Sequence, residues 1–372
     1  MEYLDRKSSS TVVGVFLNLS KLIIKSQSGS YTAEFCTFPD SFLDGNFYLV
    51  DSNLKNRFKL QPKNVIFLEA DEERKTLGTA ERLILDLSIA GMTKGDKLVV
   101  VGGGYLQDIG TLVASLYMRG VKWDYYPTTL AAMGDSCIGG KSSINVMPIK
   151  NLVGNFYPPS KIFIDSSFVN SLPALEIVAG LSEIIKICYA RDQAVFMNSL
   201  ELINNWDSTK NLSSLNDLIL LSLESKKYFV EEDEFDTGIR KLLNFGHSFG
   251  HAIEAASNFA IPHGVAVLIG MIAACEYETS TTSKQSELLQ RVSLKLLSEV
   301  MASVQDTLES FDLTSFGSAI AKDKKNTPTE LVLVLPAEKG LTLSKTLFSE
   351  NAITKAQEST KRAIAMIVNE VR

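Results

Sequence analysis

The chain has 372 residues, 45% of them hydrophobic and 22% charged, and a formal net charge of −6 at pH 7. This length predicts two domains, and the apolar content is sufficient for buried cores. The negative charge argues against a general nucleic-acid-binding protein, and no apolar run approaches the ~18 residues of a membrane-spanning helix. The four cysteines lie far apart without a CxxC pair, and no secretory signal is visible at the N-terminus. We therefore expect a cytoplasmic enzyme with free thiols.

The first half of the chain alternates segments typical of strands and of helices. Apolar runs predict strands at 46–51, 64–68, 97–101 and 122–127, and helical spacing predicts helices at 79–90 and 108–120. This alternation indicates an α/β domain with a mainly parallel sheet and helices on both faces.

The second half has a different pattern, because from Ala174 onward the signals are mostly helical. Helical segments are expected at 175–190, 215–230, 251–256, 265–278 and 354–371, and a single strand at 329–336. We therefore predict an α/β domain over residues 1–172 and a mainly helical domain over residues 173–372. Ligands favour the cleft between two such domains.

All three histidines of the chain, His247, His251 and His263, lie within 17 positions. His247 and His251 are four apart in a helix-like segment, so their rings share one face. His263 lies in a Pro-His-Gly turn that can fold back toward that face. Imidazole binds zinc-like ions and titrates near neutral pH. An amphipathic helix with ordinary hydrogen-bonded histidines is the alternative, but the clustering of all three favours a functional site.

A glycine triplet, Gly102–Gly104, follows the strand at 97–101 and precedes a helix. Backbone N–H groups at such a turn can approach a phosphate, and the helix adds its positive end. Asp108 lies in the first turn of that helix and is either a helix cap or a ligand contact. Thr128 and Thr129 follow the next strand at the same sheet edge, where α/β folds bind ligands. The spacing is not that of GxGxxG, so a plain tight turn remains open.

Basic residues lie within or beside glycine-rich, histidine or apolar segments rather than in charged runs. They are Arg119, Lys141, Lys150, Lys186, Lys226 and Arg240. Glu183 and Lys186 are three apart and share a helix face, which suggests a metal ligand beside an anion contact. Each lysine alone is typical of solvated surface, but together, in an acidic protein, the basic residues predict a small polyanionic substrate.

Several segments match a known family. They are GGGYLQDIG (102–110), LYMRGVKWDYYPTTLAAMGDSCIGGKSSIN (116–145), KNLVGNFYPP (150–159), AGLSEIIK (179–186), DEFDTGIRKLLNFGHSFGHAIE (233–254), PHG (262–264) and DKK (323–325). On these segments the chain resembles the 3-dehydroquinate synthase family and, more broadly, the sugar phosphate cyclases. The resemblance implies a Rossmann-like NAD-binding domain, a helical metal- and substrate-binding domain, and a homodimer.

The resemblance also implies roles for individual residues. The positions that match ligands of a catalytic Zn²⁺ or Co²⁺ ion are Glu183, His247 and His263. Those that match phosphate contacts are His251, Arg119, Lys141, Asn151 and one lysine of the DKK segment, Lys324 or Lys325, of which Lys324 is the candidate chosen. In the family the arginine reaches the neighbouring subunit's site. Lys226 and Arg240 match groups that hold a substrate carboxylate. The rest of the substrate shell is Asp135, Lys186 and Asn244. The NAD-binding positions are Asp51, Glu72, Lys75, Gly102, Gly103, Gly104, Asp108, Thr128, Thr129, Lys141, Lys150 and the turn from Phe168 to Ser171.

The implied reaction converts 3-deoxy-D-arabino-heptulosonate 7-phosphate to 3-dehydroquinate and phosphate, a step of the shikimate pathway of aromatic amino acid biosynthesis. NAD⁺ takes a hydride from a ring carbon while the metal acidifies the hydroxyl being oxidised. The resulting ketone makes the neighbouring C–H acidic, phosphate leaves, and NADH returns the hydride. Ring opening and an intramolecular aldol step close the carbocycle, so the enzyme is a carbon–oxygen lyase.

Two alternatives remain open. One is another cyclase of secondary metabolism, of the valiolone, inosose or aminodehydroquinate type, and the other is a metal-dependent NAD polyol dehydrogenase. Cyclases of neutral sugar phosphates have no substrate carboxylate to bind, so the presence of Lys226, Arg240 and Asn244 favours dehydroquinate formation.

The chain departs from the family's usual pattern at four positions. Gln107, Thr111 and Ser143 stand where the family usually has glycine, and Val265 replaces the glutamate that usually follows PHG. Val265 cannot hydrogen-bond, so support for a metal ligand through that position is absent. The region before residue 65 is also short for the family.

Overall fold

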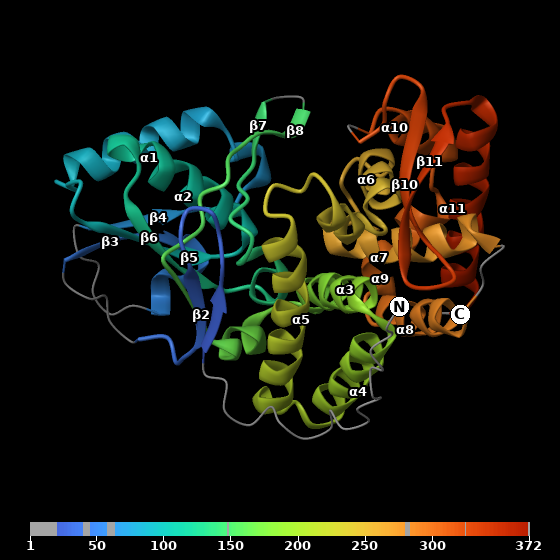
Figure 1. Ribbon diagram of the computed structural model, residues 1–372, viewed down its shortest axis with the longest axis horizontal. Coiled ribbons are helices and arrows are strands. Elements are labelled where there is room, and N and C mark those ends of the chain that lie inside the picture. Colours follow the sequence, from blue (N-terminus) through green and yellow to red (C-terminus); the bar gives the residue numbers. More distant parts are fainter. Residues whose placement is uncertain are drawn as a thin grey trace, which may run out of the picture.

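Figure 1 shows a computed structural model of the chain. The structure describes residues 21–39, 45–57, 64–146, 149–279, 283–323 and 325–370. Lys324, one of the expected phosphate contacts, lies outside these residues. In the part of the chain that is described, no helix is both long and apolar enough to cross a membrane.

A seven-stranded sheet forms the first half of the protein, in the order β1-β2-β9-β6-β5-β3-β4. Its strands are β1 (Lys21–Ile24), β2 (Tyr31–Phe35), β3 (Asn46–Asp51), β4 (Val65–Leu68), β5 (Lys97–Gly102), β6 (Lys122–Pro127) and β9 (Lys161–Ile164). β1 pairs antiparallel with β2, and the other neighbouring pairs are parallel. The interior strand β5 is buried along almost its whole length, as a strand of a parallel sheet should be. The predicted mainly parallel sheet is confirmed.

Two helices, α1 (Leu77–Ile89) and α2 (Gly104–Leu116), lie on one face of this sheet (Figure 1). Gly110 lets α2 approach β5 closely, because a Cβ there would lie 2.5 Å from Val100 Cγ2. At the start of the strands the opposite face carries a hollow lined by residues that include Tyr48 and Tyr126. The sequence predicts helices on both faces of the sheet. At the start of the strands, in the described residues, α1 and α2 lie on one face and the hollow lies on the other.

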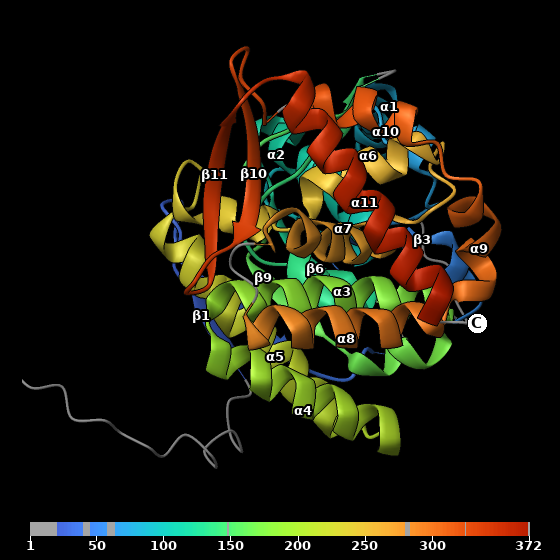
Figure 2. The ribbon, with the colours of Figure 1, turned by 90° about the vertical axis from the view of Figure 1, so that its right-hand side faces the viewer.

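Helices make up most of the second half. They are α3 (Ala174–Arg191), α4 (Gln193–Thr209), α5 (Leu212–Glu232), α6 (His247–Ala256), α7 (His263–Tyr277), α8 (Lys284–Ser298), α9 (Met301–Glu309), α10 (Leu313–Ala321) and α11 (Glu350–Glu370). α7 is buried throughout Gly264–Cys275, and α3, α6 and α11 pack around it (Figure 2). A helix that is apolar all round belongs at the centre of a domain. The predicted helical half is confirmed, whereas a domain boundary after residue 172 stays a prediction.

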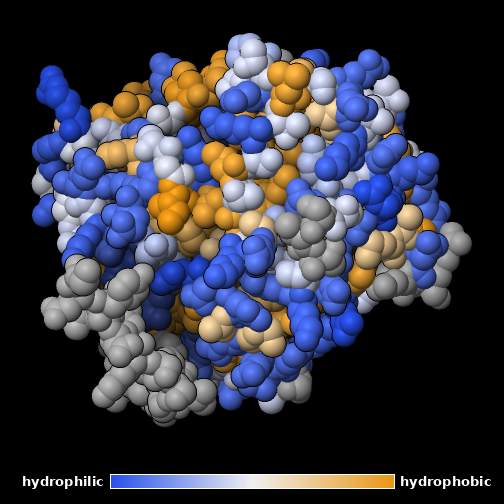
Figure 3. All heavy atoms as spheres, turned by 45° about the vertical axis from the view of Figure 1, so that its right-hand side comes forward, coloured by the Kyte–Doolittle hydropathy of each residue, from blue (hydrophilic) through white to orange (hydrophobic). Residues whose placement is uncertain are grey.

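Two small hairpins complete the strands. β10 (Glu330–Pro336) pairs antiparallel with β11 (Leu341–Leu347), and β7 (Ile144–Val146) pairs antiparallel with β8 (Ile149–Val153). The sequence predicts β10 but not the other three. β8 and β11 bury almost none of their side chains and so lack the contrast that marks a strand, and β7 has only 3 residues. Figure 3 shows hydrophobic residues reaching the surface among hydrophilic ones on one face of the molecule.

Short helical turns connect the main elements. They are η1 (Ser52–Arg57), η2 (Glu72–Arg74), η3 (Tyr117–Arg119), η4 (Ala132–Ser136), η5 (Ser166–Ser171) and η6 (Ile239–Asn244). The turn η4 is π-helical and lies directly after Thr128 and Thr129 at the carboxyl edge of the sheet. π-Helical turns are rare and occur frequently at functional sites.

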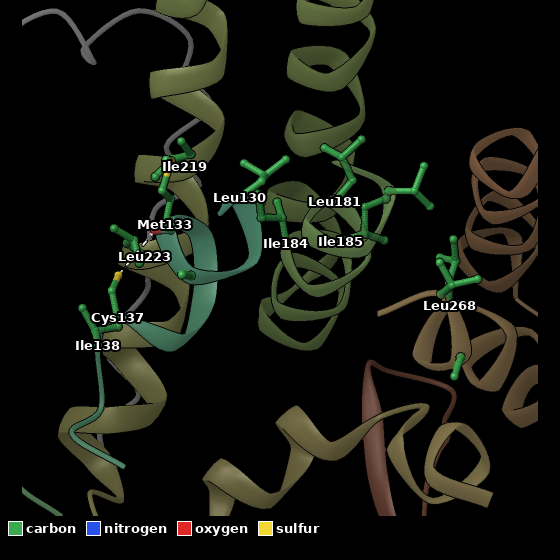
Figure 4. Close-up of a cluster of buried hydrophobic side chains, with 14 of the residues drawn as sticks. Leu130, Met133, Cys137, Ile138, Leu181, Ile184, Ile185, Ile219, Leu223 and Leu268 are labelled. Carbon is green, nitrogen blue, oxygen red and sulfur yellow. Dashed lines mark hydrogen bonds between the residues drawn. The ribbon is translucent and has the colours of Figure 1, made fainter. Parts of the chain in front are cut away.

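One hydrophobic core continues from the sheet half into the helical half. Figure 4 shows the region where the halves meet, with Leu130 beside Ile184 of α3 and Met133 beside Ile219 of α5. Gly134 of η4 makes the contact with α3 close, because a Cβ there would lie 2.5 Å from Ile184 Cγ1. This packing fixes the carboxyl edge of the sheet against the helix that carries Glu183.

Candidate active site

The glycine triplet forms the turn from β5 into α2. A Cβ on Gly103 would lie 2.8 Å from Thr129 Cγ2, whereas a Cβ on Gly104 would meet nothing within 4 Å. The described residues place no side-chain cap on the N-terminus of α2. Its first N–H groups are therefore available to an anion at the sheet edge. This geometry favours the nucleotide-binding interpretation over a plain tight turn.

A polar network surrounds Asp108 in the first turns of α2. Lys75 Nζ lies 3.2 Å from Asp108 Oδ2, 3.1 Å from Glu72 Oε1 and 2.8 Å from Asn151 Oδ1. Ser143 donates its N–H to Asp108 Oδ1 at 3.0 Å, and its hydroxyl lies 2.8 Å from Asn151 Oδ1. Burial raises the pKa of Asp108, although Lys75 opposes the shift. Ser143, a departure from the family pattern, thus joins α2 to the β7–β8 hairpin.

The predicted metal ligands converge from three helices. Glu183 comes from α3, His247 begins α6 and His263 begins α7. Glu183 Oε1 lies 4.0 Å from His247 Nε2 and 3.6 Å from His263 Nε2. The three groups supply one carboxylate and two imidazoles at one point, a donor set that suits Zn²⁺ or Co²⁺.

Hydrogen bonds to the far side of each ring orient the two imidazoles. His263 Nδ1 lies 2.9 Å from Glu254 Oε2, and His247 Nδ1 lies 3.2 Å from the carbonyl oxygen of Phe245. Both Nε2 atoms therefore face Glu183. Burial lowers the pKa of His247 well below 6.5, and the charge of Lys186 adds to the shift, so this ring is neutral as a metal ligand must be.

Glu254 changes the interpretation of Val265. Val265 is fully buried within α7 and makes no polar contact, as expected from the sequence. The carboxylate that supports His263 instead comes from Glu254, near the end of α6. Hydrogen-bond support for the metal site is therefore present in this chain through Glu254, which belongs to the family-matching segment 233–254.

His251 belongs to the same cluster of rings. Each of the three histidines has one ring nitrogen that could bind a metal ion, and these three nitrogens lie within 4.8 Å of one another. His251 Nδ1 is 3.8 Å from Asp323 Oδ2, and Lys325 Nζ is 3.3 Å from the same oxygen. Burial opposes ionisation of Asp323, but His251 and Lys325 outweigh it and lower the pKa of Asp323 to about 2. The separate phosphate role of His251 stays a prediction.

The predicted substrate shell lies beside the metal ligands. Lys186 contacts the carboxylate of Glu183 and lies 3.5 Å from Asp135 Oδ2, while Lys226 Nζ lies 2.5 Å from Asp135 Oδ1. Burial alone would raise the pKa of Asp135, but the charges of Lys226 and Lys186 outweigh it and lower the pKa. One carboxylate thus joins lysines from α3 and α5.

Arg240 and Lys141 meet at the Gly139–Gly140 turn. Arg240 is 3% exposed, and its Nη2 donates to the carbonyl oxygen of Gly139 at 3.3 Å. Lys141 Nζ lies 2.6 Å from Asp236 Oδ2. Burial lowers the pKa of Lys141, and the charge of Arg240 lowers it further, so the two cations are close enough to repel each other.

Other predicted residues make local contacts. Asn244 donates to the carbonyl oxygen of Lys241, and Asp51 ends β3 and accepts from the N–H of Asn53. Lys150 Nζ lies 3.4 Å from the centroid of the Phe259 ring. Two further residues belong to η5: Phe168, whose side chain lies in the core, and Ser171, whose hydroxyl donates to the carbonyl oxygen of Phe168.

Arg119 lies at the opposite edge of the sheet from the glycine triplet. It follows α2, whose 13 residues run from the carboxyl edge and span about 20 Å. Met118 and Arg119 have positive φ angles of 46° and 63°, which turn the chain back toward β6. Arg119 therefore does not join the rest of the site within its own chain.

Fold and site together define a class of protein. It is an α/β protein with a glycine turn suited to a nucleotide phosphate and a carboxylate–histidine cluster suited to a divalent metal ion. A 2-deoxy-scyllo-inosose synthase crystallised with carbaglucose-6-phosphate, NAD⁺ and Co²⁺ is 21% identical, with a TM-score of 0.73 over 92% of this chain and 99% of that one. A 2-epi-5-epi-valiolone synthase from Streptomyces hygroscopicus with NAD⁺ and Zn²⁺ is 19% identical, with a TM-score of 0.72 over 98% and 99%. These likenesses show the fold.

Sequence similarity identifies the family within this class. Family models described as 3-dehydroquinate synthase N-terminal and C-terminal match residues 65–179 and 180–326. A 3-dehydroquinate synthase of Dictyoglomus thermophilum is 35% identical over 81% of this chain and 83% of its own length. One of Sulfolobus acidocaldarius is 34% identical over 79% and 82%. The chain belongs to the 3-dehydroquinate synthase family, and the predicted family is confirmed.

Proposed function

We propose that this chain converts 3-deoxy-D-arabino-heptulosonate 7-phosphate to 3-dehydroquinate and phosphate, the lyase step of its family in the shikimate pathway. The observation that carries the proposal is the convergence of Glu183, His247 and His263 beside Asp135 and its two lysines. Family membership supports the same reaction.

NAD⁺ and Zn²⁺ or Co²⁺ are the proposed cofactors. Solved relatives carry NAD⁺ with Co²⁺ or Zn²⁺, and the residues of this chain fit both groups. Glu183, His247 and His263 would hold the metal, which would supply Lewis-acid polarisation of a substrate hydroxyl. The N-terminus of α2 would receive the pyrophosphate of NAD⁺. The side chains proposed around the nucleotide are Asp51, Glu72, Lys75, Asp108, Thr128, Thr129, Lys141 and Lys150.

An acidic substrate suits the positive charge near Gly139. Arg240 and Lys226 are buried, Lys141 is about half exposed, and desolvation lowers the pKa of each. Asp135 and Asp236 offset two of these charges. A substrate carboxylate would neutralise the remaining positive charge, since a buried charge is costly without a partner. A neutral sugar phosphate has no carboxylate and would leave that positive charge unpaired.

A homodimer is proposed because Arg119 lies at the far edge of the sheet from its own site. A neighbouring subunit would bring a second Arg119 to the phosphate, as the family pattern implies. The four cysteines are free thiols, which supports a reducing compartment such as the cytoplasm.

The test is to incubate the metal-loaded protein with the heptulosonate phosphate and NAD⁺. Release of phosphate together with dehydroquinate, without accumulation of NADH, supports the proposal. Turnover of sedoheptulose 7-phosphate in place of the acidic substrate would identify another cyclase, a candidate favoured by the structural likeness to the valiolone and inosose synthases. Stoichiometric NADH would identify a dehydrogenase.

A further inference from the structure

Gln107 makes a two-point contact with the π-helical turn η4. It projects from the first turns of α2 and is 4% exposed. Its Nε2 donates to the carbonyl oxygen of Ser136 at 2.6 Å, and its Oε1 accepts from the Ser136 hydroxyl at 2.6 Å. Both polar groups of the amide are therefore bonded to one residue that is 29 positions away in the sequence.

Side chains from other elements bind the successive carbonyl groups at the end of η4. Ser222 of α5 donates to the oxygen of Gly134 at 2.7 Å, and Lys226 of α5 donates to the oxygen of Asp135 at 2.7 Å. Gln107 of α2 binds the third, that of Ser136. The last carbonyls of a helical turn lack partners within the helix, so these side chains determine where the turn lies.

Asp135 is the functional residue of this turn. Its carboxylate lies 2.5 Å from Lys226 and 3.5 Å from Lys186, which also contacts Glu183. Lys226 and Ser222 connect the turn to α5, whereas Gln107 connects it to the helix that begins at the glycine triplet. Among these three side chains, Gln107 is the one that links Asp135 to the nucleotide side of the cleft.

We propose that Gln107 is a positioning residue whose amide holds η4, and through it Asp135 and Lys226, at a set distance from the nucleotide-binding end of α2. A glycine, which the family usually has at this position, has no side chain and could not make the contact. This inference rests on the proposed function for its kinetic readout. The position of η4 itself can be measured without turnover.

The experiment compares Gln107→Met with Gln357→Met in the full-length, metal-loaded protein. Methionine preserves most of the side-chain volume but neither donates nor accepts strongly. Gln357 is the matched control, because its Nε2 also donates to a backbone carbonyl oxygen, that of Leu313, at 2.8 Å, away from the site. Hydrogen–deuterium exchange of peptides covering 132–138, NAD⁺ affinity, melting temperature, kcat and KM are measured for both.

Gln107→Met should speed exchange in 132–138 and lower kcat/KM by about 10- to 100-fold, the scale of a small misplacement of reacting groups. NAD⁺ affinity should stay within twofold, and the control should change neither exchange nor kinetics. Unchanged exchange in 132–138, or a loss of kcat/KM that Gln357→Met reproduces, would overturn the proposal. If the wild-type protein has no turnover, the proposed function fails. Hydrogen–deuterium exchange in 132–138 then still tests whether Gln107 positions η4.

Ser136→Ala provides a second variant if Gln107→Met does not fold. It removes the bond to Gln107 Oε1 and keeps the bond from Gln107 Nε2 to the backbone. We expect a smaller change in the same direction. Wild-type exchange together with wild-type kcat/KM in Ser136→Ala would count against the proposal.

Discussion

Glu254 provides a specific test of the metal site, because it touches a proposed ligand without being one. Its Oε2 lies 2.9 Å from His263 Nδ1, and its side chain is 13% exposed. By accepting the Nδ1 proton, the carboxylate directs Nε2 toward Glu183, 3.6 Å away, and makes the ring a more basic ligand. Glu254→Ala removes this acceptor and leaves the proposed ligands in place.

Loss of such a partner typically weakens metal binding by about 10- to 100-fold, which corresponds to about 1.4–2.7 kcal/mol. We expect Glu254→Ala to raise the Zn²⁺ dissociation constant by this factor. Competition with a chelator of known affinity at constant pH measures it. Activity at limiting Zn²⁺ should fall in parallel and recover largely when Zn²⁺ is in excess.

Glu276→Ala is the matched control. Glu276 is a partly buried glutamate of α7 whose carboxylate accepts from Gln290 and Arg362, and it lies outside the proposed site. Its replacement should leave Zn²⁺ affinity unchanged. A dissociation constant within twofold of wild type in Glu254→Ala would refute the reasoning, and equal weakening in both variants would assign the effect to general loss of stability.

Three further predictions concern the substrate shell and the subunit contact. Arg240→Ala should lower kcat/KM for the acidic substrate about 100-fold, because removing one partner of a buried charge pair costs about 2–5 kcal/mol; an equal loss of NAD⁺ affinity would argue against a carboxylate role. Asp323→Asn should destabilise the protein by about 2 kcal/mol at neutral pH, since the pKa of Asp323 is about 2 against an ordinary 3.8. This contribution is present above pH 3.8 and is lost as the pH falls toward 2, so urea unfolding should show the two proteins converging in acid, and a constant difference would contradict it. Mixing Arg119→Ala with Glu183→Ala chains should restore about a quarter of the wild-type rate if Arg119 acts across a twofold dimer, whereas no recovery would exclude that arrangement.

Local patterns predicted the elements that carry the site. Hydrophobic runs located β3, β4, β5 and β6, and helical spacing placed Glu183 and Lys186 on one face of a buried helix. Glu254 was within reach of the same reasoning, because it lies three residues after His251 on the same helix. Its contact with His263 is not visible in the sequence, because it depends on how α6 packs against α7.

Contacts between distant segments were beyond sequence reasoning. Gln107 and Ser136 are 29 residues apart, and Asp135 and Lys226 are 91 apart. Neither pair shares a helix face or a strand register, so no periodicity signals their contact. The weakly buried strands β8 and β11 were missed for a related reason, since a pattern of burial is visible only where side chains are buried.

The sequence by itself determined the fold class, the glycine turn and the group of residues proposed to supply metal and anion contacts. Each depends on short-range spacing, which the helix and strand periods translate directly into a shared face. The tertiary structure decided which residues meet: Glu183 with His263, Asp135 with two lysines, and Glu254 with His263. These pairings depend on how α3, α5 and the η4 turn pack through buried side chains such as Ile184, and packing of that kind is a property of the whole core.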